Sequence, residues 1–153
     1  MTGDAPATVR RFIHGNALVL GETGLLIIGP SGGGKSSLTL ALLARATAAG
    51  DFARLVGDDR VSIAACNGRP IACPHPSIEG LIEVRGLGIL CRPFEPACVV
   101  AAVVEIVEPA PKRLPAPDEL FGELAGESTP WLRIVTGDPS AEIKIFEFIQ
   151  SLG

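Results

Sequence analysis

The sequence predicts an α/β domain organised around a glycine-rich loop that joins a buried strand to a helix. An apolar run at residues 25–28 precedes the loop, and a leucine-rich segment at 36–49 follows it. A β-branched run at 99–107 supplies a further strand. With 153 residues and 47% hydrophobic content, the chain is long enough to bury one core, so we assign residues 9–153 to a single domain. Residues 1–8, which are small and polar, are expected to form a flexible lead.

The elements of the first half follow from alternation and turn residues. Weak alternation over 9–20 predicts two strand pieces separated by His14-Gly15. A turn at 21–24 leads into the strand at 25–28, and Gly50 ends the helix predicted over 36–49. The later predictions are a strand at 54–56 and a hairpin over 60–71 that turns at Asn67-Gly68.

The second half contains more proline and glycine. Prolines make 73–76 a loop, and glycines interrupt the apolar pattern over 82–90. After the strand at 99–107, four prolines predict an extended segment over 108–117, and a short strand is expected at 132–135. A last helix is predicted over 140–152, with Asp138 as its cap and Pro139 in its first turn. One face of it is expected to carry Ile145, Phe148, Ile149 and Leu152.

Residues 29–36 match the P-loop pattern G-x-x-x-x-G-K-[ST] at every fixed position. Glycines permit positive φ, so successive backbone N–H groups can point at phosphate oxygens, and the helix start adds its dipole. Lys35 would meet the β- and γ-phosphates, and the Ser36 hydroxyl would meet Mg²⁺. A chance match is disfavoured by the strand and helix on either side, so we expect a phosphate chain to bind here. The residues expected to contact the nucleotide are Gly29, Pro30, Ser31, Gly32, Gly33, Gly34, Lys35, Ser36 and Ser37.

Asp58 and Asp59 directly follow the strand predicted at 54–56. In a parallel sheet around a P-loop, the carboxyl end of a neighbouring strand faces the phosphates. One acid could organise Mg²⁺ while the other accepts the proton of an attacking hydroxyl. Asp58 is therefore a candidate metal ligand, and both acids, with Lys35, are candidate catalytic residues. The alternative is a solvated turn, in which Asp is common.

Other polar residues give weaker signals when judged by spacing alone. Glu83 lies in a stretch with Arg85 and two glycines, which suits either a close-fitting loop or a surface turn. His14 is isolated, and an isolated histidine is more often structural than functional. The cysteines form no C-x-x-C pair and are expected to be reduced, small core residues. They are Cys66, Cys73, Cys91 and Cys98.

Composition disfavours several classes of partner. The net charge of −4 argues against broad nucleic-acid binding. The longest uninterrupted apolar run, residues 97–104, falls far short of the roughly 18–20 residues of a membrane span. The amino-terminal residues lack the basic and apolar blocks of a secretory signal. We therefore expect a cytoplasmic location, with neither nucleic acid nor membrane as a partner.

Four segments occur in an informative order: His14-Gly15, 29–36, 56–61 and 82–89. Together they resemble the catalytic domain of bacterial HPr kinase/phosphorylase over roughly residues 9–107. The last segment, IEVRGLGI, is similar to the family signature E-[IV]-R-G-x-G-[IL], which is far more specific than a P-loop. The resemblance implies a P-loop kinase domain of the HPr kinase/phosphoenolpyruvate carboxykinase-like type, with a mixed β-sheet and few helices. The length matches a short, catalytic-domain-only form associated with alphaproteobacteria.

The resemblance also implies roles for individual residues. Lys35 would contact the β- and γ-phosphates, while Ser36 and Glu83 would hold Mg²⁺. Asp59 is the favoured base that takes the proton of the substrate serine, and His14 would lie beside the catalytic carboxylates. The implied activity is ATP- and Mg²⁺-dependent phosphorylation of a serine of the phosphocarrier protein HPr, which regulates phosphotransferase-system signalling.

Two further family traits bear on this chain. The family can reverse its reaction by phosphorolysis, yet residues 108–117 lack the Gly-Arg pair usual in the loop linked to that direction. Family members are commonly hexamers, so self-association is expected.

Two alternatives stay open at this level. One is a nucleotide-sensing module that binds ATP and engages a partner through its proline-rich segment without phosphotransfer. The other is a small-molecule P-loop kinase, which would usually need an arginine-bearing lid.

Overall fold

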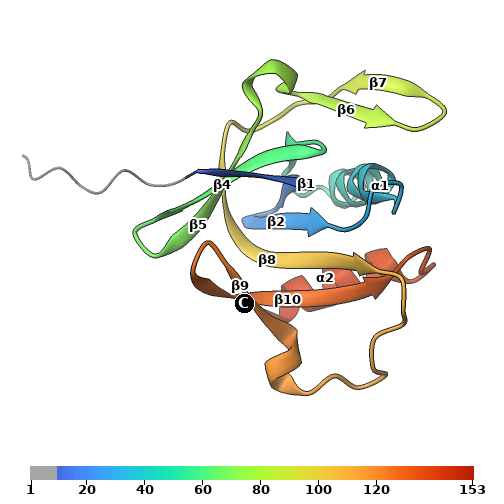
Figure 1. Ribbon diagram of the computed structural model, residues 1–153. Coiled ribbons are helices and arrows are strands. Elements are labelled where there is room, and N and C mark those ends of the chain that lie inside the picture. The colour runs from blue at the N-terminus through green and yellow to red at the C-terminus, as the bar shows by residue number, and fades with distance from the viewer. Residues whose placement is uncertain (1–9) are drawn as a thin grey trace, which may run out of the picture.

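The computed structural model describes residues 10–153, so the expected lead at 1–8 lies outside the described residues. Two sheets and two α-helices make up the fold (Figure 1). The strands are β1 (Arg11–Leu20), β2 (Thr23–Ile28), β3 (Ala53–Gly57), β4 (Arg60–Cys66), β5 (Arg69–Pro74), β6 (Leu81–Val84), β7 (Gly88–Cys91), β8 (Cys98–Val107), β9 (Phe121–Leu124) and β10 (Glu127–Val135). The helices are α1 (Lys35–Ala48) and α2 (Ala141–Ser151), with 3-10 turns at Pro76–Ile78 and Pro117–Leu120.

The central strands make a mixed sheet, as predicted from the family resemblance. β1 lies between β2 and β3 and is antiparallel to both, so β2 and β3 point the same way. β8 is parallel to β2, and β10 is parallel to β8. We expected the strand that precedes Asp58 and Asp59 to be a parallel neighbour of β2, but the direct neighbour of β2 is the antiparallel β1. β3 lies one strand further away and still ends at the same edge of the sheet as β2. That edge holds the loop at 29–34 and the acids at 58–59.

Two long strands each take part in two layers. The first half of β1 pairs with β4, and the second half pairs with β2 and β3. The start of β8 pairs with β5, and the rest pairs with β2 and β10. β4 and β5 therefore bridge from β1 to β8 and close over one face of the central strands.

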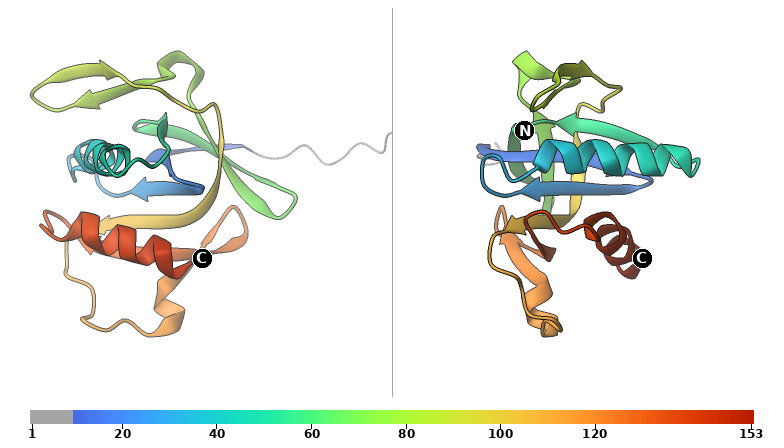
Figure 2. Two further views of the ribbon diagram at one scale, coloured as in Figure 1. Left: turned by 180° about the vertical axis from the view of Figure 1, so that it is seen from behind. Right: turned by 90° about the vertical axis from the view of Figure 1, so that its right-hand side faces the viewer.

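Helices α1 and α2 cover the other face of the central strands (Figure 2). Alternate residues of β2 serve the two faces: Leu25 and Ile27 pack with the helices, and Leu26 packs towards β4 and β5. This alternation follows from the two-residue period of a strand. The helix-side core includes Leu18, Leu42, Val104, Ile134 and Ile145.

Close packing between β2 and β8 requires glycine at position 24. A Cβ built on Gly24 would lie 1.9 Å from the carbonyl oxygen of Val99, which no side chain could tolerate. Only a residue without a Cβ lets the two backbones approach this closely.

Most predicted elements are confirmed. The strands at 25–28, 54–56 and 99–107, the helix at 36–49 and the hairpin turning at Asn67-Gly68 are all present, with bounds shifted by at most three residues. Asn67 and Gly68 both have positive φ, as a tight hairpin turn requires. The glycine-interrupted stretch at 82–90 forms the β6–β7 hairpin, which lies apart from the main sheet and above α1 in Figure 1.

Several predicted details are wrong. His14-Gly15 does not divide two strands: β1 runs through it without a break, because this is where β1 exchanges one partner for another. Residues 73–74 complete β5 rather than belonging to a loop. The strand at 132–135 is the end of the longer β10, which pairs with a strand, β9, that was not predicted.

The ends of α2 and the cysteines also differ from expectation. Ser140 rather than Asp138 is the cap residue, although Asp138 Oδ1 accepts the Ser140 N–H at 2.8 Å. Leu152 is exposed and outside the packed face.

Two of the four free cysteines, Cys66 and Cys91, are exposed because each is the last residue of a strand in a β-hairpin. Burial raises the pKa of the Cys98 thiol to about 12, with a smaller contribution from nearby Cys73.

None of the helices formed by residues 10–153 is both long and apolar enough to cross a membrane.

Candidate active site

The loop at residues 29–36, called the glycine loop below, joins the carboxyl end of β2 to the start of α1. Gly32 and Gly34 have φ of 79° and 89°, a conformation that other residues rarely adopt. The Gly33 N–H donates to the Pro30 carbonyl at 3.0 Å and tightens the turn. The loop thus ends with free helical N–H groups at the start of α1, which favour an anion.

Lys35 folds back over this loop. Its side chain is buried, with only 8% of the residue exposed, and its Nζ donates to the carbonyls of Gly29 and Pro30, both at 3.2 Å. The ammonium therefore lies beside the loop where a phosphate would sit. A bound phosphate could replace these two neutral acceptors with charged ones, which form stronger hydrogen bonds.

Asp58 is tied to both sides of the site. It is only 5% exposed, and its Oδ1 accepts the Ser36 hydroxyl at 2.6 Å. Its Oδ2 accepts the Glu83 backbone N–H at 2.8 Å. Both carboxylate oxygens are thus engaged, and Asp58 connects the glycine loop to the β6–β7 hairpin.

Asp59 is placed differently from its neighbour. Its backbone adopts a left-handed conformation with φ of 62°, and its side chain is 69% exposed. Its backbone N–H donates to Asn16 Oδ1 at 2.8 Å, and its carbonyl accepts the Gly15 N–H at 3.1 Å. β1 therefore fixes the backbone of Asp59, while its carboxylate stays available to an incoming group.

Asn16 links the acid to α1. It is fully buried, and its Nδ2 donates to Thr39 Oγ1 at 3.0 Å and to Ser36 Oγ at 3.4 Å. Thr39 in turn donates to the Lys35 carbonyl at 2.7 Å. One side chain from β1 thus connects the backbone of Asp59 with the first turn of α1.

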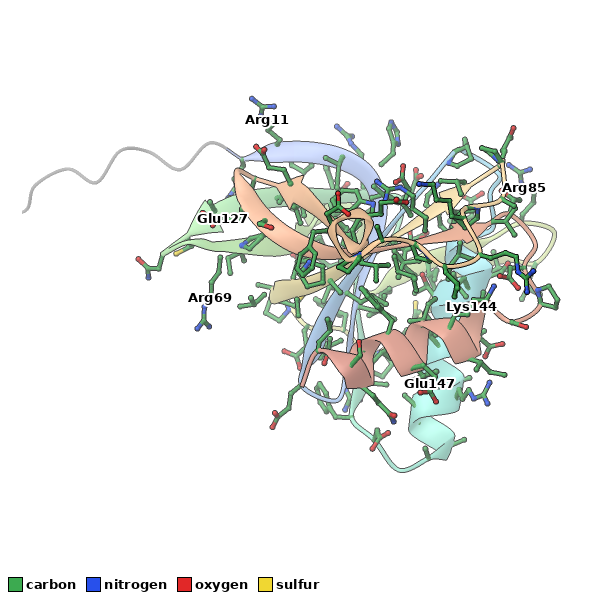
Figure 3. All side chains as sticks on the ribbon, turned by 90° about the horizontal axis from the view of Figure 1, so that it is seen from below. Arg11, Arg69, Arg85, Glu127, Lys144 and Glu147 are labelled. Atoms are coloured by element: carbon green, nitrogen blue, oxygen red, sulfur yellow. The ribbon has the colours of Figure 1, made fainter. Side chains whose placement is uncertain are left out.

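These groups surround one pocket of about 350 Å³. Arg85, at the turn of the β6–β7 hairpin, also lines it, and its guanidinium lies against Gly32, 3.3 Å from where a Cβ would be. In Figure 3, Arg85 lies at the end of the molecule opposite Arg69 and the β4–β5 hairpin. The residues lining the pocket are Ser31, Gly32, Gly34, Lys35, Ser36, Ser37, Asp58, Asp59, Glu83 and Arg85.

His14 lies at a second, adjoining hollow of about 260 Å³, which Gly29, Ser31, Lys35 and Asp59 also line. Its Nδ1 is 3.9 Å from Asp59 Oδ1, and both side chains are exposed. At this distance the two side chains do not form a hydrogen bond, and solvent weakens their interaction.

The structure therefore brings the residues proposed from the sequence to one place. Gly33 faces a different cavity, on the β8–β10 side of the loop, and Pro30 contributes its carbonyl to the loop rather than to a pocket wall. Three residues were missed as site components: Asn16, Thr39 and Arg85. Arg85 belongs to the EVRG segment and could have been chosen, whereas Asn16 stands in an apolar run that gives no sign of function.

The oxygen-rich donor set suits a hard cation. The Ser36 hydroxyl and the carboxylates of Asp58 and Glu83 are the kinds of ligand that Mg²⁺ prefers. Within residues 10–153 no three His, Cys, Asp or Glu side chains already form a metal cage. Two carboxylates and one hydroxyl fit Mg²⁺, which usually takes only one or two carboxylates and completes its shell with phosphates and water.

Comparison with known proteins agrees with this arrangement. A family model described as the HPr Serine kinase C-terminal domain matches residues 7–92, more than half of the chain. The chain belongs to this family. Curated relatives in the HPr serine kinase family include HPr kinase/phosphorylase of Lactobacillus johnsonii, 36% identical over 88 residues, and that of Clostridium tetani, 40% identical over 81 residues. The matches cover 57% and 53% of this chain but only 26% and 25% of those proteins.

A solved structure extends the likeness to nearly the whole fold. The HPr(Ser) kinase/phosphatase of Coxiella burnetii superposes with a TM-score of 0.72 and 23% identity, covering 92% of this chain and 95% of that one. At this identity the likeness establishes the fold. The α/β fold of the HPr serine kinase family, with a mixed sheet and two α-helices, is therefore shown.

Proposed function

We propose that the chain is an ATP- and Mg²⁺-dependent serine kinase that phosphorylates the phosphocarrier protein HPr or an HPr-like protein. The observation that carries this proposal is the single 350 Å³ pocket shared by the glycine loop, two aspartates, Glu83 and Arg85. Phosphoryl transfer needs a phosphate cradle, a held cation and a base, and this pocket offers a group for each. Membership of the HPr serine kinase family supports the choice of substrate.

The two aspartates are suited to different tasks. Asp58 already accepts two hydrogen bonds and is buried, so it is placed to hold Mg²⁺ together with Ser36 and Glu83. Mg²⁺, when bound, would neutralise charge on the β- and γ-phosphates. Asp59 has an exposed and uncommitted carboxylate, and it is the better base. His14, 3.9 Å from Asp59, can orient that carboxylate once a substrate excludes water.

The reaction then uses these residues as follows. The substrate serine Oγ bonds to the γ-phosphorus as the bond from that phosphorus to the bridging oxygen of ADP breaks. Asp59 takes the proton from the serine hydroxyl. Lys35 and Arg85 both lie against the glycine loop, so they would meet the phosphates and could stabilise the charge that moves to ADP.

A protein substrate fits the rim of the pocket better than a small molecule does. Leu87 and Ile89 are 70% and 67% exposed, and they lie on the same β6–β7 hairpin that carries Glu83 and Arg85. Apolar side chains exposed beside a polar pocket are typical of a surface that meets another protein. This exposed apolar rim is what favours a protein such as HPr over a small substrate.

The test is phosphotransfer to HPr from the same organism. Purified chain with ATP and Mg²⁺ is expected to place phosphate on an HPr serine, read by mass spectrometry, and EDTA should abolish the transfer. Asp59→Asn should lose transfer while still binding ATP, whereas Asp118→Asn, a change at an exposed aspartate of the Pro117–Leu120 turn, should behave as wild type. Wild-type protein that binds ATP but leaves HPr unmodified would refute the kinase assignment and favour nucleotide sensing.

Self-association is a separate part of the proposal and rests on the family resemblance alone. Light scattering of the purified chain is expected to give a mass several times that of one chain. A monomer at micromolar concentration would refute it.

A further inference from the structure

A third cavity lies on the side of the glycine loop away from Asp58. It measures about 160 Å³ and shares Gly33 and Gly34 with the loop. Its walls are mostly apolar and come from four elements. They include Leu38 of α1, Ile106 of β8, Ile134 of β10 and Ala141 of α2.

The strand order shows on which side of the glycine loop this cavity lies. β2, which leads into the glycine loop, has β1 and then β3 on one side and β8 and then β10 on the other. Of the two acids proposed to hold Mg²⁺, Asp58 directly follows β3, and Glu83 of β6 donates its backbone N–H to Asp58. Mg²⁺ held there would bind the β- and γ-phosphates. With Mg²⁺ held there, the terminal phosphates would point to the β3 side and the nucleoside would leave the loop towards β8 and β10, where the cavity lies.

We propose that this cavity is the subsite for the purine base of the nucleotide, an inference that rests on the proposed function. Aliphatic side chains can sandwich the flat base and remove it from water, which is the main stabilising term for an apolar surface. Taken with the 350 Å³ pocket, the space available falls in the range of about 300–1,000 Å³ usual for a small-molecule site.

The polar groups around the cavity offer little discrimination between purines. Asp138 lines it with its carboxylate fixed in place, because Oδ1 accepts the Ser140 N–H and Oδ2 accepts Lys144 Nζ. The Val135 carbonyl accepts the Asp138 N–H at 3.1 Å, and both this carbonyl and the carboxylate can only accept further hydrogen bonds, which the amino groups of adenine and of guanine could each donate. The base is therefore held by shape and apolar contact, and GTP is expected to compete about as well as ATP.

Filling the cavity tests the proposal. Ala141→Leu adds an apolar side chain at the cavity wall, and Ala44→Leu adds the same atoms at an exposed position of α1 as the matched control. The probes are ATP and inorganic tripolyphosphate, each with Mg²⁺, measured by calorimetry. Ala141→Leu should weaken ATP at least about tenfold, which corresponds to about 1.4 kcal/mol, and should leave tripolyphosphate unchanged within about twofold. Ala44→Leu should change neither.

A second measurement uses wild-type protein and does not depend on the variant folding. Photolabelling with 2-azido-ATP should mark the peptide containing residues 134–141 or Leu38. Label on the β6–β7 hairpin instead, or ATP that binds no tighter than tripolyphosphate, would overturn the base subsite while leaving the proposed function intact. Failure of both ligands to bind wild type would refute the proposed function, and this inference with it.

Discussion

Replacing Asn16 with alanine is the sharpest test of how the site is held together. Asn16 is fully buried, and its side chain makes good hydrogen bonds to the Asp59 N–H at 2.8 Å and to Thr39 Oγ1 at 3.0 Å. The contact to Ser36 Oγ at 3.4 Å is too long to add much. The variant would lose two hydrogen bonds of about 1 kcal/mol each and leave a partly buried N–H group unpaired, which costs about 1–3 kcal/mol.

Asn16→Ala should therefore lower the free energy of unfolding by about 3–5 kcal/mol. For a domain of this size that corresponds to a fall of about 6–20 °C in melting temperature. Urea unfolding followed by the fluorescence of Trp131, the single tryptophan, measures the change. A loss below about 0.5 kcal/mol would show that this network does not stabilise the fold.

A double-mutant cycle assigns the effect to the pair rather than to the cavity left behind. Thr39→Val removes the acceptor of the Asn16 amide and also a hydrogen bond to the carbonyl four residues earlier. Thr47→Val is the matched control, because Thr47 makes the same bond within α1, to the Leu43 carbonyl at 2.7 Å. The Asn16–Thr39 pair should show a coupling of about 1 kcal/mol, and the Asn16–Thr47 pair about none. Equal coupling in both cycles would refute a direct interaction.

Three further outcomes are expected. Gly24→Ala should abolish or severely destabilise the fold, since its Cβ would meet a β8 carbonyl at 1.9 Å; a circular dichroism melt within 2–3 °C of wild type, about 1 kcal/mol, would contradict this. The hydrogen bond from Lys144 lowers the pKa of Asp138, so Lys144→Met should reduce stability by less than about 1 kcal/mol, with the full effect above the usual carboxyl pKa of about 3.9. That deficit should vanish as the pH falls through the pKa of folded Asp138, and unfolding curves that coincide at pH 7 would refute it. Finally, iodoacetamide at pH 8 should modify exposed Cys66 quickly and Cys98 only after unfolding, because burial raises the Cys98 pKa to about 12 and the thiolate is the reactive form.

The sequence predicted correctly those parts of the fold that depend on the backbone preferences of a few neighbouring residues. The glycine loop, the turn at Asn67-Gly68 and the stop of α1 at Gly50 each depend on residues that tolerate positive φ, and all have that conformation. Long β-branched or leucine-rich runs, such as β8 and α1, were equally clear. The resemblance to the HPr serine kinase family then added the mixed character of the sheet, which no single segment reveals.

Features that depend on distant partners were missed. β9 is short and contains Gly122, where a Cβ would lie only 2.4 Å from Trp131 Cε3, so its pairing with β10 depends on a close contact across a turn. β1 looked interrupted at His14-Gly15 because its two halves face different sheets. Asn16 could not be recognised, because its role depends on Asp59 and Thr39, which lie 43 and 23 residues away in sequence.

The pairing of β2 with β8 has a consequence for the order in which the protein is made. β2 lies against β8 from Gly24 to Ile28, and a Cβ on Gly29 would meet Ile106 at 2.9 Å, so late residues form the support beneath an early loop. At about 5–20 residues per second on the ribosome, β8 emerges several seconds after β2. A nascent chain arrested before β8 should therefore pass through immobilised ATP unretained, and retention should begin only once that strand has left the exit tunnel.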